Sequence, residues 1–429
     1  MADRYLSLMD GPRETISAQM LKLSGQQWSA INSRTHEEEN TMRSKALVSH
    51  FCLAALLTSY SYAAESAYKY EVVAQSGVKI DGISLGSFGS VAMNDLGTVV
   101  FEAGYNDGSY AGASGVFSRN HALLKRGDIV RGLTVNRAFI GGINDFNELA
   151  LSFSYGNGLP VALGKFVKHD QSIVPEGKLV KTGDAIEGLT IRDFRETTIN
   201  DIGEIVFSAD YSDSSGGGIG VFTRDRVLLK VGSEIKGIPL SGNNAFNRLY
   251  GLSDYGTLVF DTIGFQPGLG ITQTGAFTQR KVLALAGDTV DGISLLGVFS
   301  PAISHFGRSA FTGEYANGAA CSSCIGYAVF APAGEIAKTG DTISGITLTD
   351  YIVSEGINDD GVVLMQANFR GGYGLFTKDS VVAATGDTLA GFQVEGFVNS
   401  QINDFGDVAF SAFEAVLVAK HKNGQEKHK

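Results

Sequence analysis

The sequence has little proline, cysteine or tryptophan and no surplus of positive charge. Among 429 residues there are 7 prolines, 3 cysteines and 1 tryptophan, and the formal net charge is −11. Scarce proline and the lack of a Gly-X-Y period exclude a collagen-like chain. A negative charge opposes binding to phosphate backbones and anionic lipids, so nucleic acid is not an expected partner. The 44% of hydrophobic residues suffice for a large core.

Catalytic motifs are also missing. The sequence has no G-x-S-x-G elbow, H-E-x-x-H pair, P-loop or EF-hand loop. His305 occupies a position that is Asp in most copies of the repeat described below, so we interpret it as a turn residue. We therefore predict no catalytic residues and no cofactor, and Ca²⁺ is the one metal that repeated carboxylates would suit.

Residues 42–64 have the three parts of a secretory signal. Arg43 and Lys45 form a positive start, Ala46–Leu57 is an apolar run, and small residues near Ala63 suit a signal peptidase. A buried helix or a membrane anchor is the alternative, but the apolar run is short for a bilayer span. We predict a signal peptide over 42–63, export to the periplasm or the medium, and no transmembrane anchor.

The segment before this signal, residues 1–41, is polar and without clear periodicity. A signal peptide belongs at the N-terminus of a chain. Residues 1–41 are therefore interpreted as a non-native leader that results from a misplaced start, or as a disordered leader.

Two cysteines remain after the signal, Cys321 and Cys324, in Cys-Ser-Ser-Cys. In an oxidising compartment this spacing favours a local disulfide that closes a Gly/Ala-rich loop. The alternatives are a redox pair and half of a zinc site. A zinc site would need a second Cys or His pair at ligand spacing, which the sequence lacks.

The strongest feature is an internal repeat of two short motifs. A Gly-Asp pair follows an apolar run, and Asn-Asp-x-Gly begins about 17 residues after its glycine. The Gly-Asp pairs are Gly127-Asp128, Gly183-Asp184, Gly287-Asp288, Gly340-Asp341 and Gly386-Asp387, with degenerate copies at Ser76-Gly77 and Gly232-Ser233. The second motif begins at Asn94, Asn144, Asn200, Ser253, Ser304, Asn358 and Asn403. The chain therefore holds seven copies.

Each copy predicts about four short strands and no helix. Asn and Asp favour turns and Gly supplies positive φ, so Asn-Asp-x-Gly is a hairpin turn. An apolar strand follows, then a Gly-rich loop, a short strand ending in a core Phe, and a strand leading into Gly-Asp. Four strands repeated seven times predict an all-β, seven-bladed β-propeller over residues 68–419.

The two ends of the repeat region predict how the ring closes. The region begins with a single strand, Tyr70–Ala74, and ends after a third strand, Ala415–Val418. Pairing these strands completes the last blade and removes an exposed sheet edge. We therefore predict a closed, monomeric ring in preference to a β-solenoid or a string of sandwiches.

The motif Asn-x-x-Gly-x-x-x-Phe is intact in three copies, Asn94/Gly97/Phe101, Asn200/Gly203/Phe207 and Asn403/Gly406/Phe410. It resembles the bacterial exported tandem-repeat proteins defined by this motif, which often carry a C-terminal surface-sorting segment. The resemblance spans nearly all of the mature chain and implies export and a propeller-like fold, with no agreed activity. Residues 420–429 depart from it, because they form a basic polar tail without a hydrophobic anchor, which favours a soluble periplasmic or secreted form.

Propeller geometry suggests where a ligand would bind. With the strands of a repeat named a to d, a lying just before Asn-Asp-x-Gly, the d–a and b–c connections emerge on one face, where the Gly-Asp carboxylates would encircle one end of the axis. The predicted ligand-face residues are Asp128, Asp184, Asp288, Asp341, Asp387, Tyr105, Tyr110, Tyr155, Tyr211, Tyr315 and Tyr373. Tyrosine rings beside Asp and Asn suit a carbohydrate or a peptide. Alternatively, each Asp bonds nearby backbone N–H groups, and the Asn-Asp-x-Gly turns are structural.

Together these features predict an exported, non-catalytic binding module that presents loops on a rigid ring to a carbohydrate or protein ligand. A secreted enzyme acting on glycans and a structural component of the envelope or matrix are the alternatives. Several buried carboxylates with raised pKa values in one central cleft would favour the enzyme.

Overall fold

The computed structural model describes residues 66–422, except 107–110, 158–159, 170–171, 215, 241–245, 247, 267–270 and 318–324. The chain divides into two units, Met1–Glu65 and Ser66–Lys429, and only the second contains described residues. The leader, the signal peptide and the Cys321–Cys324 disulfide lie outside the described residues and stay predictions. Within the described ranges, no helix is long and apolar enough to cross a membrane.

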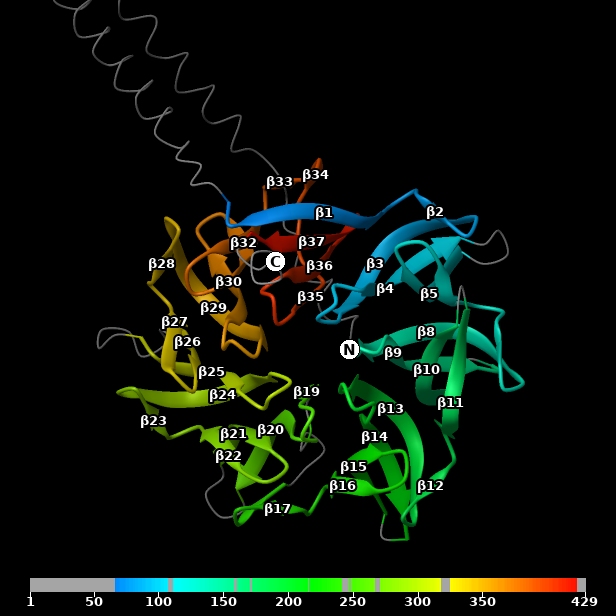
Figure 1. Cartoon of the computed structure of the whole chain (residues 1–429). Helices are drawn as coiled ribbons and strands as arrows, with labels where there is room; N and C mark the ends of the chain where they lie inside the picture. Colours follow the sequence, from blue (N-terminus) through cyan, green and yellow to red (C-terminus); the bar gives the residue numbers. More distant parts are fainter. Residues whose placement is uncertain are drawn as a thin grey trace, which may run out of the picture. The chain divides into compact units, whose positions relative to one another are not determined.

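Every regular element in the described residues is a β-strand, and the strands form seven blades around one axis (Figure 1). Blade one contains β2 (Lys79–Ile80), β3 (Ile83–Met93), β4 (Val99–Asn106), β5 (Ala111–Ser118) and β6 (Ala122–Leu124). Blade two contains β7 (Ile129–Val130), β8 (Leu133–Ile143), β9 (Glu148–Tyr155), β10 (Val161–His169) and β11 (Ser172–Lys181). Blade three contains β12 (Ala185–Ile186), β13 (Leu189–Ile199), β14 (Ile205–Asp213), β15 (Gly216–Thr223) and β16 (Val227–Lys230).

The remaining blades repeat this plan. Blade four contains β17 (Glu234–Ile235), β18 (Ile238–Pro239), β19 (Arg248–Leu252), β20 (Leu258–Gln266), β21 (Ile271–Thr278) and β22 (Val282–Leu285). Blade five contains β23 (Thr289–Val290), β24 (Ile293–Ile303), β25 (Ser309–Ala316), β26 (Ile325–Ala331) and β27 (Gly334–Lys338). Blade six contains β28 (Thr342–Ile343), β29 (Ile346–Ile357), β30 (Val363–Phe369), β31 (Gly372–Phe376) and β32 (Val381–Ala384). Blade seven contains β33 (Thr388–Leu389), β34 (Phe392–Gln393), β35 (Asn399–Ile402), β36 (Val408–Ala412), β37 (Ala415–His421) and, from the start of the chain, β1 (Tyr68–Gln75).

The first strand of the chain completes the last blade, as the sequence predicts. β1 pairs antiparallel with β37, with Tyr70 opposite Ala419, Val72 opposite Leu417 and Ala74 opposite Val416. The sheet order β1-β37-β36-β35 places β1 outermost. This pairing removes the open edge of β37, so the seven-bladed closed ring is confirmed.

The repeated phenylalanines form the core of the blades. Phe101, Phe207 and Phe410 are fully buried, because the b strand that follows each turn is covered on both faces by neighbouring blades. Phe101 stacks on Phe117 of the c strand, with ring centroids 6.1 Å apart. Blade-to-blade burial of aromatic rings is the main favourable contribution to the fold.

Side-chain acceptors join the inner strands of successive blades. Bulges in these strands leave backbone N–H groups without a partner in their own sheet. The Glu102 carboxylate accepts the N–H of Ile140 at 2.8 Å, and the Glu196 carboxylate accepts the N–H of Leu249 at 2.8 Å. The inner strands are therefore joined to each other by polar contacts as well as by packing.

Candidate functional site at the propeller axis

The Asn-Asp-x-Gly turns connect the a and b strands, and they meet around the axis. In each intact copy the Asn side-chain oxygen accepts the N–H four residues later, for example Thr98 N–H to Asn94 at 2.8 Å. The Asn side-chain amide donates to the next blade, for example from Asn94 to the carbonyl of Asn144 at 2.9 Å. One buried side chain therefore closes its own turn and joins it to its neighbour.

The aspartates of these turns form a second set of links, which continues from blade seven back to blade one. The backbone N–H of Asp95 donates to the carboxylate of Asp145 at 2.9 Å, and the N–H of Asp404 donates to Asp95 at 2.7 Å. Equivalent bonds join Asp145 to Asp201, Asp201 to Asp254 and Asp359 to Asp404. We call the seven side chains Asp95, Asp145, Asp201, Asp254, His305, Asp359 and Asp404 the axial ring.

The ring changes where the repeat is degenerate. Ser253 and Ser304 keep the contact within the turn, because their hydroxyls accept the N–H groups of Thr257 and Arg308. Serine has no amide to donate to the next blade. At the same place Asp254 N–H donates to the backbone carbonyl of His305 at 3.0 Å, since His305 offers no carboxylate.

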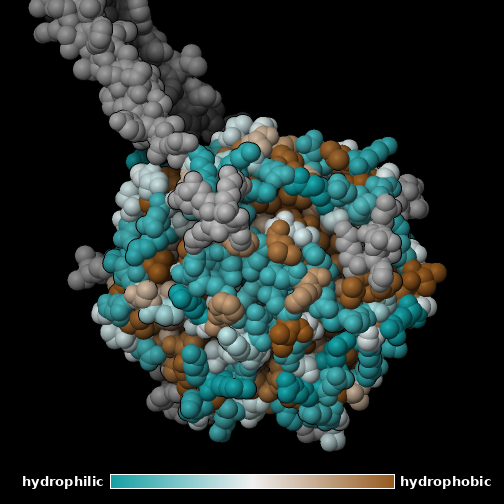
Figure 2. Space-filling view, viewed as in Figure 1, coloured by the Kyte–Doolittle hydropathy of each residue, from teal (hydrophilic) through white to brown (hydrophobic). Residues whose placement is uncertain are grey.

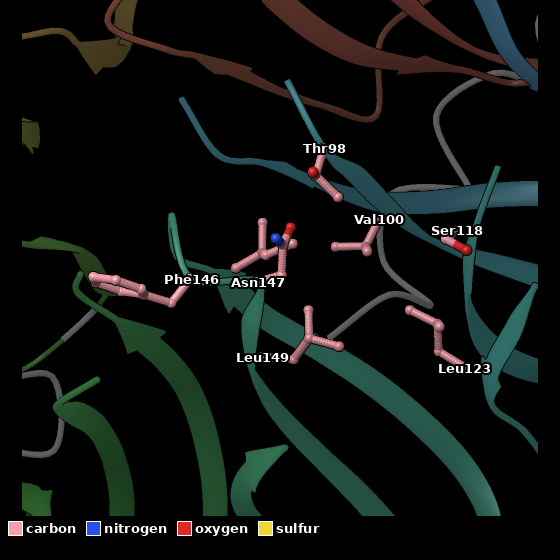
Figure 3. Close-up of a pocket in the computed structure, with 8 residues that line it drawn as sticks. Thr98, Val100, Ser118, Leu123, Phe146, Asn147 and Leu149 are labelled. Atoms are coloured by element: carbon pink, nitrogen blue, oxygen red, sulfur yellow. The ribbon is translucent and has the colours of Figure 1, made fainter. Parts of the chain in front are cut away.

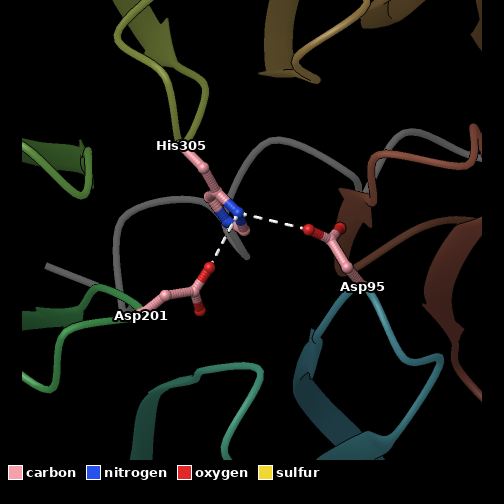
Figure 4. Close-up of side chains that lie close together, drawn as sticks. All are labelled: Asp95, Asp201 and His305. Carbon is pink, nitrogen blue, oxygen red and sulfur yellow. Dashed lines mark ion pairs between the residues drawn. The ribbon is translucent and has the colours of Figure 1, made fainter.

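His305 points across the ring to two aspartates (Figure 4). Its Nδ1 lies 3.2 Å from Oδ2 of Asp95 and 3.2 Å from Oδ2 of Asp201. Burial disfavours the charged imidazole, but the hydrogen bonds and charges of the two carboxylates outweigh it and raise the pKa of His305 to about 11. The imidazolium is therefore the ring's own counter-ion at neutral pH.

The other ring carboxylates are less well compensated. Loss of hydration, together with the charges of Asp95 and Asp359, raises the pKa of Asp404 to about 7. Loss of hydration also raises the pKa values of Asp145 and Asp254. Six carboxylates around one imidazolium make this end of the axis strongly acidic.

Two groups of ring side chains have ligand atoms within 4.8 Å of one another, Asp95 with Asp201 and His305, and His305 with Asp359 and Asp404. A metal ion would need a neutral imidazole, whereas His305 is protonated at neutral pH. Ca²⁺ also prefers oxygen ligands alone. The ring carboxylates are therefore better suited to the protonated His305 than to a metal ion. Ca²⁺ binding stays a prediction.

Large apolar side chains surround the axial ring. They occupy position x of the Asn-Asp-x-Gly turns, and we call Leu96, Phe146, Ile202, Tyr255 and Phe306 the crown. Their exposed fractions range from 65% to 74%, and among the other large hydrophobic residues of the described ranges only Ile129 is as exposed, at 73%. Figure 2 shows apolar side chains set in a hydrophilic centre on this face. The remaining x positions are Asp360 and the half-buried Phe405.

A hollow of about 380 Å³ opens beside the crown between blades one and two (Figure 3). Val100, Leu123 and Leu149 give it apolar walls, and Phe146 and Asn147 lie at its edge. Asn147 replaces the turn glycine and has φ of +58°, a conformation that Asn tolerates better than most residues. The hollow is open to solvent and large enough to admit an apolar side chain.

The predicted Gly-Asp acids lie elsewhere. Each accepts the backbone N–H three residues before it, at 2.8–3.0 Å, near the end of the outermost strand of a blade; the pairs are Asp128–Lys125, Asp184–Lys181, Asp288–Leu285, Asp341–Lys338 and Asp387–Ala384. The strands that follow these turns lie at the periphery of the ring, as β12, β23, β28 and β33 show in Figure 1. The five acids therefore do not encircle the axis, because the outermost strand ends at the rim. Ligand contact by them stays a prediction.

The predicted tyrosines are packed within the blades. Tyr105 is buried and accepts the N–H of Arg126 at 2.9 Å, and Tyr211 is buried edge-on against Phe222. The other three described tyrosines, Tyr155, Tyr315 and Tyr373, are half-buried. Tyr110 lies outside the described residues. Ligand contact by these tyrosines stays a prediction.

The sequence contained a signal for the crown. The interpretation of the Asn-Asp-x-Gly turns as purely structural missed this signal. A hairpin tip normally carries polar residues, yet position x holds Leu, Phe, Ile, Tyr, Phe and Phe in six of seven copies. Repeated apolar residues at an exposed turn indicate a contact surface.

Neither a protein-family model nor a curated protein matches the chain. Among solved structures, the Dos1 propeller is 10% identical with a TM-score of 0.39, covering 83% of this chain and 96% of that one. The WD40 β-propeller domain of Doa1 is 11% identical with a TM-score of 0.42, covering 83% and 99%. The extracellular domain of the putative one-component system BT4673 from B. thetaiotaomicron is 9% identical with a TM-score of 0.39, covering 83% and 42%. These likenesses carry no functional argument, and membership of the Asn-x-x-Gly repeat family stays a prediction.

Proposed function

We propose that the protein is an exported, non-catalytic interaction module that binds a peptide segment of a partner on the face formed by the crown and the axial ring. The observation that carries the proposal is the crown. Natural chains rarely place large apolar side chains at successive exposed turn tips unless a partner covers them. Export is supported by the signal sequence at 42–63.

The chemistry of the face suits a peptide better than a sugar. Leu96 and Ile202 are aliphatic and pack against apolar side chains, whereas a sugar ring stacks on flat aromatic faces. The hollow beside Phe146 accepts one such side chain. The carboxylates of the axial ring favour Lys or Arg next to it, since Asp145 and Asp254 each have one oxygen without a hydrogen-bond partner in the described part of the chain.

Raised pKa values on the inner strands do not by themselves support the enzyme alternative. Glu102 and Glu196 accept backbone N–H groups of the next blade, and Asp261 accepts the N–H of Ser300 in the next blade at 3.3 Å. These carboxylates hold the blades together, and burial there is sufficient to raise their pKa values.

The test is a peptide array in which Lys or Arg is flanked by Leu and Phe at varied spacing, with Glu in place of the basic residue as the control set. We expect the basic apolar peptides to bind and the Glu set not to bind. Ile202→Ser should weaken the best peptide about tenfold, which corresponds to about 1.4 kcal/mol. Ile129→Ser is the matched control, because Ile129 has the same side chain and exposure but lies off the crown.

If Ile202→Ser and Ile129→Ser weaken peptide binding equally, the crown is not the binding surface. Binding to a glycan array without binding to any peptide would replace the peptide by a carbohydrate. Release of product from a bound glycan would show an enzyme instead.

A further inference from the structure

A second hollow, of about 570 Å³, lies at the rim of blade two, beside its outermost strand β11 (Figure 1). We call it the rim hollow. Three cationic side chains line it, Arg131, Lys178 and Lys181, together with one carboxylate, Asp184. Three cations and one carboxylate leave an excess of two positive charges, in a chain whose net charge is −11. The rim hollow is therefore a basic site on an acidic protein.

The turn between β7 and β8, which carries Arg131, departs from the equivalent turns of the other blades. In all seven blades the first residue of this turn has positive φ; the residues are Asp81, Arg131, Glu187, Lys236, Asp291, Ser344 and Ala390. In blades one, three and five its carboxylate accepts a backbone N–H near the start of the outermost strand, at 2.7–3.1 Å. Arg131 cannot accept a hydrogen bond, and its Nη2 donates to the carbonyl of Pro175 on β11 at 3.4 Å. Blade two thus places a cation where three other blades use an anion to hold the sheet.

A bulge in β11 supplies Lys178. In the pairing of β10 with β11, Gly177, Lys178 and Leu179 lie opposite Gly164 alone, so the bulge contains two extra residues. The outermost strand pair of each of the other six blades has a bulge with one extra residue. Gly177 has φ of +68°, a conformation that suits glycine. Bulges of this kind redirect side chains and are common beside functional sites.

Lys181 is not neutralised by the acid nearest to it in the sequence. In blade one the equivalent lysine, Lys125, pairs with Asp128 at 2.6 Å. In blade two Asp184 accepts only the backbone N–H of Lys181, at 3.0 Å, and the two side chains form no ion pair. The ammonium group of Lys181 is therefore left for another partner.

The other two cations are also unpaired. Neither Arg131 nor Lys178 forms an ion pair within the part of the chain that the structure describes. Glu176, next to the bulge, is already paired with Lys165 at 2.6 Å. Cations that no protein carboxylate neutralises, set around a hollow, attract an anionic ligand.

We propose that the rim hollow binds the phosphate monoester group of a small molecule. A phosphate monoester is a dianion, which matches the two excess positive charges. The guanidinium of Arg131 can donate two parallel N–H groups to two phosphate oxygens, and Lys178 and Lys181 add point charges. Leu133 and Leu179 also line the hollow and offer apolar contact to the carbon skeleton of the ligand. This site shares no residue with the crown and does not depend on peptide binding there.

The matched probes are phenyl phosphate and phenol, which share a ring but differ in charge. Isothermal titration calorimetry of the full chain at pH 8, where the phosphate is doubly ionised, should show binding of phenyl phosphate and none of phenol. Added NaCl should weaken the binding, because it screens the charges. Arg131→Gln should weaken phenyl phosphate at least tenfold. Lys236→Gln is the matched control, because Lys236 occupies the same turn position in blade four and should leave the affinity unchanged.

Wild-type affinity in Arg131→Gln, an equal loss in Lys236→Gln, equal binding of the two probes, or no binding of phenyl phosphate would each overturn the proposal. Lys178→Gln is an independent second variant, at an exposed position, and should also weaken phenyl phosphate. Circular dichroism melting establishes that each variant is folded. Binding of phenyl phosphate that survives Ile202→Ser separates the rim hollow from the crown.

Discussion

At the scale of single residues, the turn asparagine explains both the repeat and its exceptions. Asn200 accepts the N–H of Glu204 at 2.8 Å within its turn and donates to the carbonyl of Ser253 at 3.0 Å in the next blade. The bond within the turn uses the side-chain oxygen, and the bond to the next blade uses the side-chain amide. Ser253 and Ser304 show that the bond within the turn can persist without the bond to the next blade.

Replacing Asn200 by Ser and by Ala should therefore separate the two contributions. Ser keeps an acceptor for Glu204 N–H and should lower the free energy of unfolding by about 1 kcal/mol. Ala leaves that N–H unpaired as well and should cost about 2–3 kcal/mol. Denaturant titration measures both, and equal losses in the two variants would contradict separate roles.

At the scale of elements, the inner strands depend on carboxylates that are costly to ionise. Glu102 on β4 accepts the N–H of Ile140 on β8. Loss of hydration raises the pKa of Glu102 from 4.5 to about 7, although this hydrogen bond favours the charged form. Because the folded pKa is the higher one, this group's contribution to stability falls as pH rises from about 4.5 to about 7.

Glu102→Gln should remove this pH dependence while keeping an acceptor for Ile140. At pH 8 we expect the variant to be more stable than the wild type by about 2 kcal/mol, and at pH 4 to be no more stable. Guanidinium unfolding at the two pH values measures the difference. Glu395→Gln, at an exposed position, is the control and should change neither value.

At the scale of the whole molecule, the ring closes through strands from opposite ends of the chain. β1 pairs with β37, and the N–H of Lys422 donates to the carbonyl of Ala67 at 3.0 Å. The hydrogen bonds between the turns also close the ring, since the N–H of Asp404 in blade seven donates to Asp95 in blade one. Closure therefore involves both the outer edge and the axis of the propeller.

A chain that begins at Ser76 should lose this closure. Without β1 the edge of β37 is open, so we expect a lower melting temperature and self-association through that edge. Size-exclusion chromatography and thermal melts, compared with the chain that begins at Ala64, measure both effects. Adding a synthetic peptide of residues 66–75 should restore the monomer, and a truncated chain that stays monomeric with an unchanged melt would contradict the prediction.

The sequence by itself determined the seven blades, the turn positions and the pairing of the first strand with the last blade. These features follow from local rules, because Asn, Asp and Gly specify a turn wherever they recur and an incomplete repeat needs its missing strand. The burial of the repeated Phe follows from the same periodicity.

Only the tertiary structure decided which polar residues meet. Gly-Asp and Asn-Asp-x-Gly look equally acidic in sequence, yet Asp128 bonds the outermost strand of its blade and Asp95 lies at the axis. The position of a turn along the radius of the ring depends on how the blades pack, and so do the contacts of His305 with Asp95 and Asp201. These pairs join blades far apart in the chain, and no local pattern specifies a contact across the axis.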